Sequence, residues 1–227
     1  MGLLKNISDN TNPDSLAVRM RRRRFEFFLK LLSPLKEPVR IIDIGGTEQF
    51  WEQMGLAGTE SVEITAVNLT PFEPRYPNVH SVIGNGCDLR ELFQDNQFDV
   101  VFSNSVIEHV PNLAGQQKMA AEMMRLAPRY FVQTPNYYFP LEPHFLVPGF
   151  QWMPEALQVY LLMHFNLGWA GKHSDRQTAV NTARSVKLLR RRELSGLFPG
   201  CQIYCEKALG LNKSFVAYGG WDLTAAQ

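Results

Sequence analysis

A tandem glycine pair follows a buried apolar run and could hold a ligand. The stretch from Arg40 to Trp51 reads RIIDIGGTEQFW, and its apolar half is typical of a central parallel strand. Glycine lets the backbone approach a ligand closely, and the free amides of a following helix favour a carboxylate or phosphate. The three spaced glycines of a dinucleotide fingerprint are absent, because Gly45 and Gly46 are followed by TEQ. The pair therefore predicts a ligand loop without naming its ligand.

Histidines and a neighbouring carboxylate are the candidate acid–base groups, since histidine titrates near neutral pH. Glu108 and His109 lie in the sequence IEHV, and His144 lies in LEPHF. We take all three as candidate catalytic residues, with His144 or His109 as the base. The alternative for Glu108 and His109 is structural, as the start of a helix that bonds local backbone. The alternative for His144 is a loop histidine in contact with aromatic side chains.

Alternating strands and helices would bring these residues to one edge of a sheet. Apolar runs predict strands at 39–44, 62–67, 79–83, 98–103 and 130–133. Helical patterns between them predict helices at 47–56, 88–93 and 113–126. This alternation indicates an α/β fold with a mostly parallel sheet and right-handed crossovers. Ligands of such sheets bind beyond the carboxyl ends of the strands, where the glycine pair lies.

Other segments flank this core within a single domain of residues 1–227. Residues 137–185 are dense in aromatic residues and prolines and then helical from about Pro154. They are too long and too apolar for a plain loop, so we interpret them as a cap over one sheet edge. An amphipathic helix is predicted over 186–197. Two strands with a turn near Asn212 would follow it and complete the sheet as an antiparallel hairpin.

A basic helix is predicted within the N-terminal residues 1–36. Asn12 and Pro13 are typical of an N-cap and a first helical position, and Ser33-Pro34 would end the helix. Arginines at 19 and 21–24 lie opposite its apolar positions. Such a run is most often a solvated face, and the alternatives are contact with an anionic acceptor or with a membrane surface.

The composition limits the class of protein. The 227 residues suit one medium domain, and a net charge of +1 gives no general attraction to nucleic acid. Cys87, Cys201 and Cys205 are too few and too scattered for a disulfide framework, which favours a reducing compartment. We see no apolar signal core and no stretch near the ~20 apolar residues of a membrane span. We therefore expect a cytoplasmic protein, while its oligomeric state stays open.

Five motifs occur along the chain in an informative order: RIIDIGGT, ITAVNLTP, IGNGCDL, FDVVFSNSVIEHV and KALGLNKSFVAY. Their order and spacing resemble those of the class I S-adenosylmethionine-dependent methyltransferases, over about residues 39–135 and 186–220. The EHV version is closest to the small-molecule methyltransferase branch. The resemblance implies a Rossmann-like, doubly wound, mostly parallel seven-stranded sheet with an antiparallel C-terminal hairpin. It also implies S-adenosyl-L-methionine as cofactor and S-adenosyl-L-homocysteine as product.

The resemblance assigns cofactor roles by position. The glycine turn would line the methionine moiety, Asn68 would meet the ribose hydroxyls, residues 85–88 would flank the adenine, and Asn104 would lie beside the sulfonium. Thr47 and Gln49 replace later glycines of the family, and Asn68 replaces its acidic residue, which could weaken ribose binding by ~1 kcal/mol. The complete predicted cofactor set is Asp43, Gly45, Gly46, Thr47, Asn68, Leu69, Gly86, Cys87, Asp88, Asn104 and Ser105.

The expected acceptor is a small, partly apolar or aromatic molecule, with O-methylation favoured over C-methylation. The loop at 103–106 reads SNSV, which lacks the Asn/Asp-Pro-Pro-aromatic loop used on nucleobase amino groups and the Pro-Cys nucleophile used on cytosine C5. Nucleic acid is therefore disfavoured as a partner. Aromatic residues of the cap could form the acceptor pocket, although they could also simply pack the cap onto the sheet. The predicted substrate residues are Tyr137, Tyr138, Phe145 and Trp152.

Two other functions stay open. Glu108, His109 and the TPN sequence at 134–136 resemble a divalent-metal site of the small-RNA 3′-terminal methyltransferases. That branch has a further Glu at the position of Ser105, for which Glu142 could substitute beside His144. We nevertheless assign no metal. The departures at Gln49 and Asn68 motivate the second alternative, a non-catalytic binding protein with this fold.

Overall fold

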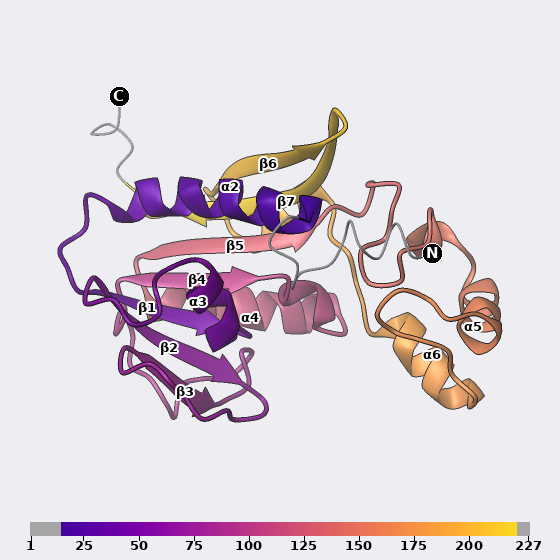
Figure 1. The fold of residues 1–227 in the computed structure, drawn as a ribbon, viewed down its shortest axis with the longest axis horizontal. Coiled ribbons are helices and arrows are strands. Elements are labelled where there is room, and N and C mark those ends of the chain that lie inside the picture. Colours follow the sequence, from indigo (N-terminus) through magenta and orange to yellow (C-terminus); the bar gives the residue numbers. More distant parts are fainter. Residues whose placement is uncertain (1–14, 222–227) are drawn as a thin grey trace.

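The computed structural model describes residues 15–221 and forms a seven-stranded sheet covered by helices on both faces (Figure 1). The predicted N-cap at Asn12-Pro13 lies outside the described residues, and the described helix begins after Ser15, whose side chain accepts the Val18 N–H. The elements in chain order are α2 (Leu16–Leu32), β1 (Val39–Ile44), α3 (Glu48–Gln53), β2 (Val62–Asn68), β3 (Val79–Ile83), β4 (Val100–Asn104), η1 (Ile107–His109), α4 (Leu113–Leu126), β5 (Arg129–Pro135), η2 (Phe150–Trp152), α5 (Glu155–His164), α6 (Arg176–Arg184), α7 (Arg191–Leu197), β6 (Gln202–Ala208) and β7 (Leu211–Gly219).

The strand order is β3-β2-β1-β4-β5-β7-β6. β1 pairs in parallel with β2 and β4, whereas β7 is antiparallel to both β5 and β6. The predicted seven-stranded, mostly parallel sheet with an antiparallel C-terminal hairpin is thus confirmed. Strand order reverses between β1 and β4, and in such sheets the ligand crevice lies outside the strand ends at this reversal.

Each face of the sheet has its own apolar core, because neighbouring residues of a strand point to opposite faces. Ile41 of β1 packs in the cluster of Phe28 from α2, while Ile42 packs in the cluster of Met123 from α4. The rings of Phe102 and Phe131 stack on neighbouring strands with centroids 5.7 Å apart. Burying each such side chain stabilises the fold by ~1.5–3 kcal/mol. The two cores hold the strand ends in fixed positions.

Residues 137–185, which include α5 and α6, fold as a separate lobe beyond the carboxyl ends of the strands (Figure 1). Phe145, Phe150 and Leu162 are buried in its own apolar cluster. Its two ends meet at the sheet, since Asn136 forms a bridge with Leu189 and Tyr137 N–H donates to the Leu189 carbonyl at 3.1 Å. We keep the name cap for residues 137–185.

Some predicted local structure is wrong. Residues 88–93 form turns rather than a helix, because the Leu89 N–H is held by Glu122 Oε2 at 3.0 Å and the chain is tied to α4. Only the last part of the helix predicted at 186–197 is helical, since Leu189 is extended against Asn136. The hairpin turn lies at Leu209-Gly210, where both residues have positive φ, instead of near Asn212. None of the described helices has the length and apolar character needed to cross a membrane.

Candidate active site

A cavity of about 540 Å³ opens at the carboxyl ends of the central strands. Gly45 follows β1, Asn68 ends β2, and Ser105 follows β4, so three adjacent strands deliver its polar walls. Val67 and Met119 add apolar surface. The volume lies within the ~300–1,000 Å³ typical of small-molecule sites. The cavity is therefore the main candidate for a cofactor site at the strand-order reversal.

The two glycines are required by the backbone and by their neighbours. Gly45 has φ +80°, a left-handed conformation, and a Cβ there would come within 2.5 Å of Val106 Cγ2. A Cβ on Gly46 would overlap the carboxylate of Asp43. The turn consequently lies directly over the Asp43 side chain, and no larger residue fits at Gly46 without moving that carboxylate.

Asp43 is an almost fully buried carboxylate beneath this turn. Its Oδ2 accepts the Trp51 Nε1–H at 2.7 Å, and its Oδ1 has no hydrogen-bond partner among residues 15–221. Burial raises the pKa of Asp43 to about 7, although the bond from Trp51 opposes the shift. A second cavity of about 240 Å³ borders Asp43, Gly46 and Asn104 and continues the first one through Gly45.

Asn68 connects the end of β2 to the glycine turn. Its Nδ2 donates to the Gly46 carbonyl at 2.7 Å, which fixes the amide and leaves Oδ1 as an acceptor beside the larger cavity. A carboxylate could not donate this bond. With Asn68 in place of the acidic residue of the family pattern, the chain has one hydrogen-bond acceptor fewer. It gains the hydrogen bond to Gly46 that holds the glycine turn in place.

The candidate bases form a hydrogen-bonded array at the border between the sheet and the cap. His144 Nδ1 lies 2.7 Å from Glu142 Oε1, and Glu142 Oε2 accepts the backbone N–H groups of His144 and Phe145 at 2.7 Å each. The rings of His144 and His109 meet edge to face with centroids 4.9 Å apart. His109 in turn lines the 540 Å³ cavity. Glu142 thus orients His144 and leaves its Nε2 free of this bond.

Glu108 is completely buried next to these histidines. Thr134 Oγ1 donates to its Oε2 at 3.0 Å, whereas Oε1 has no hydrogen-bond partner within the described part of the chain. Burial raises the pKa of Glu108 to about 7. Burial alone would lower the pKa of His144, but the hydrogen bond and charge of Glu142 and the charge of Glu108 outweigh it and raise that pKa. Ligating atoms of Glu108, His109 and His144 all lie within 4.8 Å of one another. Glu142 is not a member of this group.

A third cavity, of about 480 Å³, lies between the cap and the sheet. Tyr137 and Phe145 line it, as does Glu142. Tyr138 and Trp152 are about half exposed and lie outside its lining. The four aromatic residues predicted for the acceptor therefore do not gather in one pocket.

Residues 43–128 match the sequence model of a methyltransferase domain family. This stretch contains the glycine turn, Asn68, Asn104 and the Glu108-His109 pair. Together with the strand order, this match places residues 43–128 in the class I S-adenosylmethionine-dependent methyltransferase superfamily.

Two sequence relatives align with a short part of the chain. Two uncharacterized Mycobacterium tuberculosis proteins, from strains CDC 1551 / Oshkosh and ATCC 25618 / H37Rv, are each 33% identical over 64 residues, 28% of this chain and 22% of their own length. The chain thus aligns with about a fifth of each relative.

Solved structures support the fold over nearly the whole chain. The CurJ carbon methyltransferase has a TM-score of 0.59 at 12% identity over 93% of this chain and 56% of its own. The PH0226 protein of Pyrococcus horikoshii OT3 has a TM-score of 0.51 at 16% identity over 92% of both chains. Phosphoethanolamine N-methyltransferase 2 of Haemonchus contortus has 0.52 at 14% over 89% of this chain and 46% of its own. At such identities the likeness concerns the fold alone.

The residues that border the 540 Å³ and 240 Å³ cavities fit S-adenosylmethionine. The Oδ1 atom of Asp43, which has no partner within residues 15–221, suits the ammonium group of the methionine moiety. The backbone at Gly45 admits a ligand where a Cβ would clash, and Asn68 Oδ1 can accept a ribose hydroxyl. Asp43, Gly46 and Asn104 border the smaller cavity, and Asp88 is exposed and outside both linings. The predicted cofactor residues that line the larger cavity are Gly45, Thr47, Asn68, Leu69, Gly86, Cys87 and Ser105.

Several side chains at the site have no recognisable signal in the sequence. Phe72 and Val106 line the 540 Å³ cavity, called the donor cavity from here on. Single apolar residues in loops have no sequence signature. Trp51 donates to Asp43, which only the packing of α3 against the sheet reveals. Arg24 and Glu206 pair at 2.8 Å across 182 positions of the sequence. The expectation that Arg24 lies opposite the apolar positions of α2 is therefore wrong, because Arg24 is buried.

Proposed function

We propose that this protein transfers the methyl group of S-adenosylmethionine to a small, partly apolar or aromatic acceptor, with oxygen favoured over carbon as the methylated atom. The observation that carries the proposal is the Glu142–His144 pair beside His109, which lines the donor cavity. S-adenosylmethionine, when bound, supplies an electrophilic methyl group. The chain must then orient the acceptor and remove its proton.

His144 is the proposed base. Glu142 holds its Nδ1 at 2.7 Å, so Nε2 is the nitrogen that can take an acceptor proton, and the adjacent carboxylate stabilises the resulting imidazolium. His109 is the second choice, since its ring lies between His144 and the cavity. Aromatic and aliphatic surface from the cap, including Phe145, excludes water from one side of this region.

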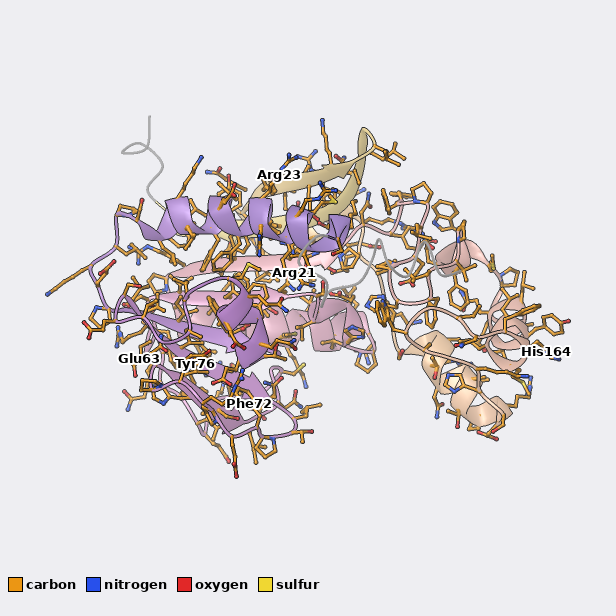
Figure 2. All side chains as sticks on the ribbon, viewed as in Figure 1. Arg21, Arg23, Glu63, Phe72, Tyr76 and His164 are labelled. Carbon is orange, nitrogen blue, oxygen red and sulfur yellow. The ribbon has the colours of Figure 1, made fainter. Side chains whose placement is uncertain are left out.

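Turnover with a panel of phenols and carboxylic acids tests the proposal, measured as transfer of a labelled methyl group. We expect wild-type protein to bind S-adenosylhomocysteine and to methylate at least one acceptor class, and His144→Ala to lower turnover by ~10²–10⁴-fold with unchanged S-adenosylhomocysteine affinity. His164→Ala is the matched control, because His164 is exposed at the far end of the cap (Figure 2). Full activity of His144→Ala would remove the base assignment, and absence of S-adenosylhomocysteine binding would favour the non-catalytic alternative.

A metal-dependent RNA methyltransferase is the second candidate, favoured by one observation. Glu108, His109 and His144 present ligating atoms within 4.8 Å of one another, and Glu108 Oε1 is unpartnered among the described residues. Imidazole nitrogens with a carboxylate oxygen suit a first-row divalent ion. Metal analysis of purified protein and activity after chelation decide between the candidates, because unaffected turnover in a strong chelator excludes the metal.

A further inference from the structure

A small cavity of about 150 Å³ lies on the other side of the strand ends from the donor cavity. It is enclosed by α2, the end of β5 and the start of β7, with Arg21, Gln133 and Ser214 among its walls. Ser105 lines both this cavity and the donor cavity, and Asn104 lines both this cavity and the one beneath the glycine turn. The cavity is therefore adjacent to the place where the methyl group must leave the donor.

One ion pair in this cavity is internally satisfied. The Arg24 guanidinium donates to Glu206 Oε1 at 2.8 Å and to Asn104 Oδ1 at 2.7 Å. Ser214 Oγ donates to Glu206 Oε2 at 2.7 Å. Side-chain exposure is only 8% for Arg24 and 6% for Glu206. The single negative charge of Glu206 is thus already matched by Arg24.

Two further cations in the same cavity have no carboxylate of their own among residues 15–221. Lys213 Nζ lies 3.9 Å from Glu206 Oε2, and Arg21 also feels the charge of Glu206. Glu206 is the one carboxylate among the described residues of the lining. Burial lowers the pKa of Arg21 to about 10 and also lowers the pKa of Lys213. Cations removed from water without a counter-charge destabilise the fold, and a bound anion would offset that cost.

The arginine run of α2 is divided by this arrangement. Arg22 and Arg23 are exposed, as a solvated face requires, whereas Arg24 is buried and Arg21 is partly covered. Figure 2 labels Arg21 on the strand side of α2 and Arg23 on the opposite side. The interpretation of the whole run as a solvated face is therefore wrong for Arg21 and Arg24.

We propose that Arg21 and Lys213 bind an anionic group, a carboxylate or a phosphate, on the methyl acceptor. Phe139, Leu141 and Pro143 line the same cavity and would contact the apolar part of that acceptor. The inference rests on the proposed methyl transfer and names its substrate class. Arg21 also borders the cavity next to Gly46, so it could instead bind the carboxylate of S-adenosylmethionine itself. The test below distinguishes an anion on the acceptor from the carboxylate of the donor.

Binding of benzoate and phenyl phosphate, with benzamide as the neutral match, tests the proposal by calorimetry in the presence of saturating S-adenosylhomocysteine. We expect at least one anion to bind wild-type protein about tenfold more tightly than benzamide. Lys213→Gln and Arg21→Gln should each weaken that anion by about tenfold. Arg22→Gln is the matched control on the same helix and should bind as wild type. Lys213 is 30% exposed, so its variant remains informative if Arg21→Gln does not fold.

Equal binding of benzamide and both anions would overturn the proposal, as would wild-type affinity in both variants. A tenfold loss of S-adenosylhomocysteine affinity with unchanged anion binding would assign the cations to the donor instead, and would overturn the acceptor assignment. S-adenosylhomocysteine affinity of the wild type is measured separately and tests the methyltransferase function itself. The same comparison of benzoate, phenyl phosphate and benzamide is repeated without S-adenosylhomocysteine. It tests the anion site even if the protein does not bind S-adenosylhomocysteine.

Discussion

Replacement of Asp43 by Asn should change how the stability of the protein depends on pH. The carboxyl of Asp43 has an ordinary pKa of 3.8 and a folded-state pKa of about 7, because it is buried. Protonation therefore stabilises the folded state at low pH, and this contribution is lost as pH rises from about 4 to about 7. The shift of about three units corresponds to about 4 kcal/mol over the full range, and about 2.5 kcal/mol of it falls between about pH 5 and about pH 8.

Asp43→Asn removes this titration while it keeps the size of the side chain. The amide oxygen can still accept from Trp51, and the amide nitrogen takes the place of the unpartnered oxygen, at a cost of ~1–3 kcal/mol that does not vary with pH. The stability of wild type relative to the variant should thus fall by about 2.5 kcal/mol from about pH 5 to about pH 8. Urea unfolding without cofactor, followed by tryptophan fluorescence, measures this difference.

Asp99→Asn serves as the control for the Asp43 experiment. The pKa of Asp99 is held below its ordinary value because the bonds and charge of Arg40 outweigh its partial burial. Its variant should differ from wild type by a constant amount over the same pH range, since Asp99 is ionised throughout in both folded and unfolded states. If the difference between wild type and Asp43→Asn were equally flat, Asp43 would be ionised in the folded protein and the reasoning on its burial would be refuted.

Three further outcomes are expected. Gly45→Ala should weaken S-adenosylhomocysteine binding at least tenfold in calorimetry, because φ is +80° and Cβ would meet Val106, whereas Gly55→Ala has the same backbone constraint in open space and should leave binding intact. Arg24→Met should lower the free energy of unfolding by ~1.5–3 kcal/mol in urea, since it removes the hydrogen-bonded cation of Glu206 and leaves Lys213 at 3.9 Å; a loss under 1 kcal/mol would contradict this. Glu142→Gln should lower kcat by ~10–100-fold with unchanged S-adenosylhomocysteine affinity in steady-state and binding assays, and unaltered kcat would show that Glu142 does not orient His144.

The strands, the helix and the glycine turn around the donor cavity could be predicted because each depends on a short stretch of sequence. The strand at 79–83 and the helix at 113–126 have the bounds predicted from their apolar patterns. The glycine turn is informative for the same reason, as φ +80° at Gly45 is a property of one residue. Such features depend on a few consecutive positions, so sequence periodicity contains them.

The packing of the cap and the 150 Å³ cavity lined by Arg21 and Lys213 could not be predicted, because they depend on contacts between distant positions. The helical stretch predicted from about Pro154 is divided into α5 and α6, and α6 has a weak apolar pattern because its residues are mostly polar and Ala179 is its one fully buried residue. Leu189 is extended because it pairs with Asn136, a contact that no local pattern contains. Arg21 and Lys213 are brought together from opposite ends of the chain. Helical spacing placed the arginines on one face, but it carried no information on what that face meets.

The bridge between Asn136 and Leu189 makes the cap a closed excursion from one point of the sheet. The chain leaves and returns at the same place, so the strand order does not depend on what lies between. For a flexible segment, each doubling of length adds only ~0.6 kcal/mol of closure entropy. A change in the length of the cap would therefore cost little closure entropy as long as its buried cluster of Phe145, Phe150 and Leu162 is kept. The strands that carry the glycine turn and the cap that carries Glu142 and His144 can thus vary in length independently of each other.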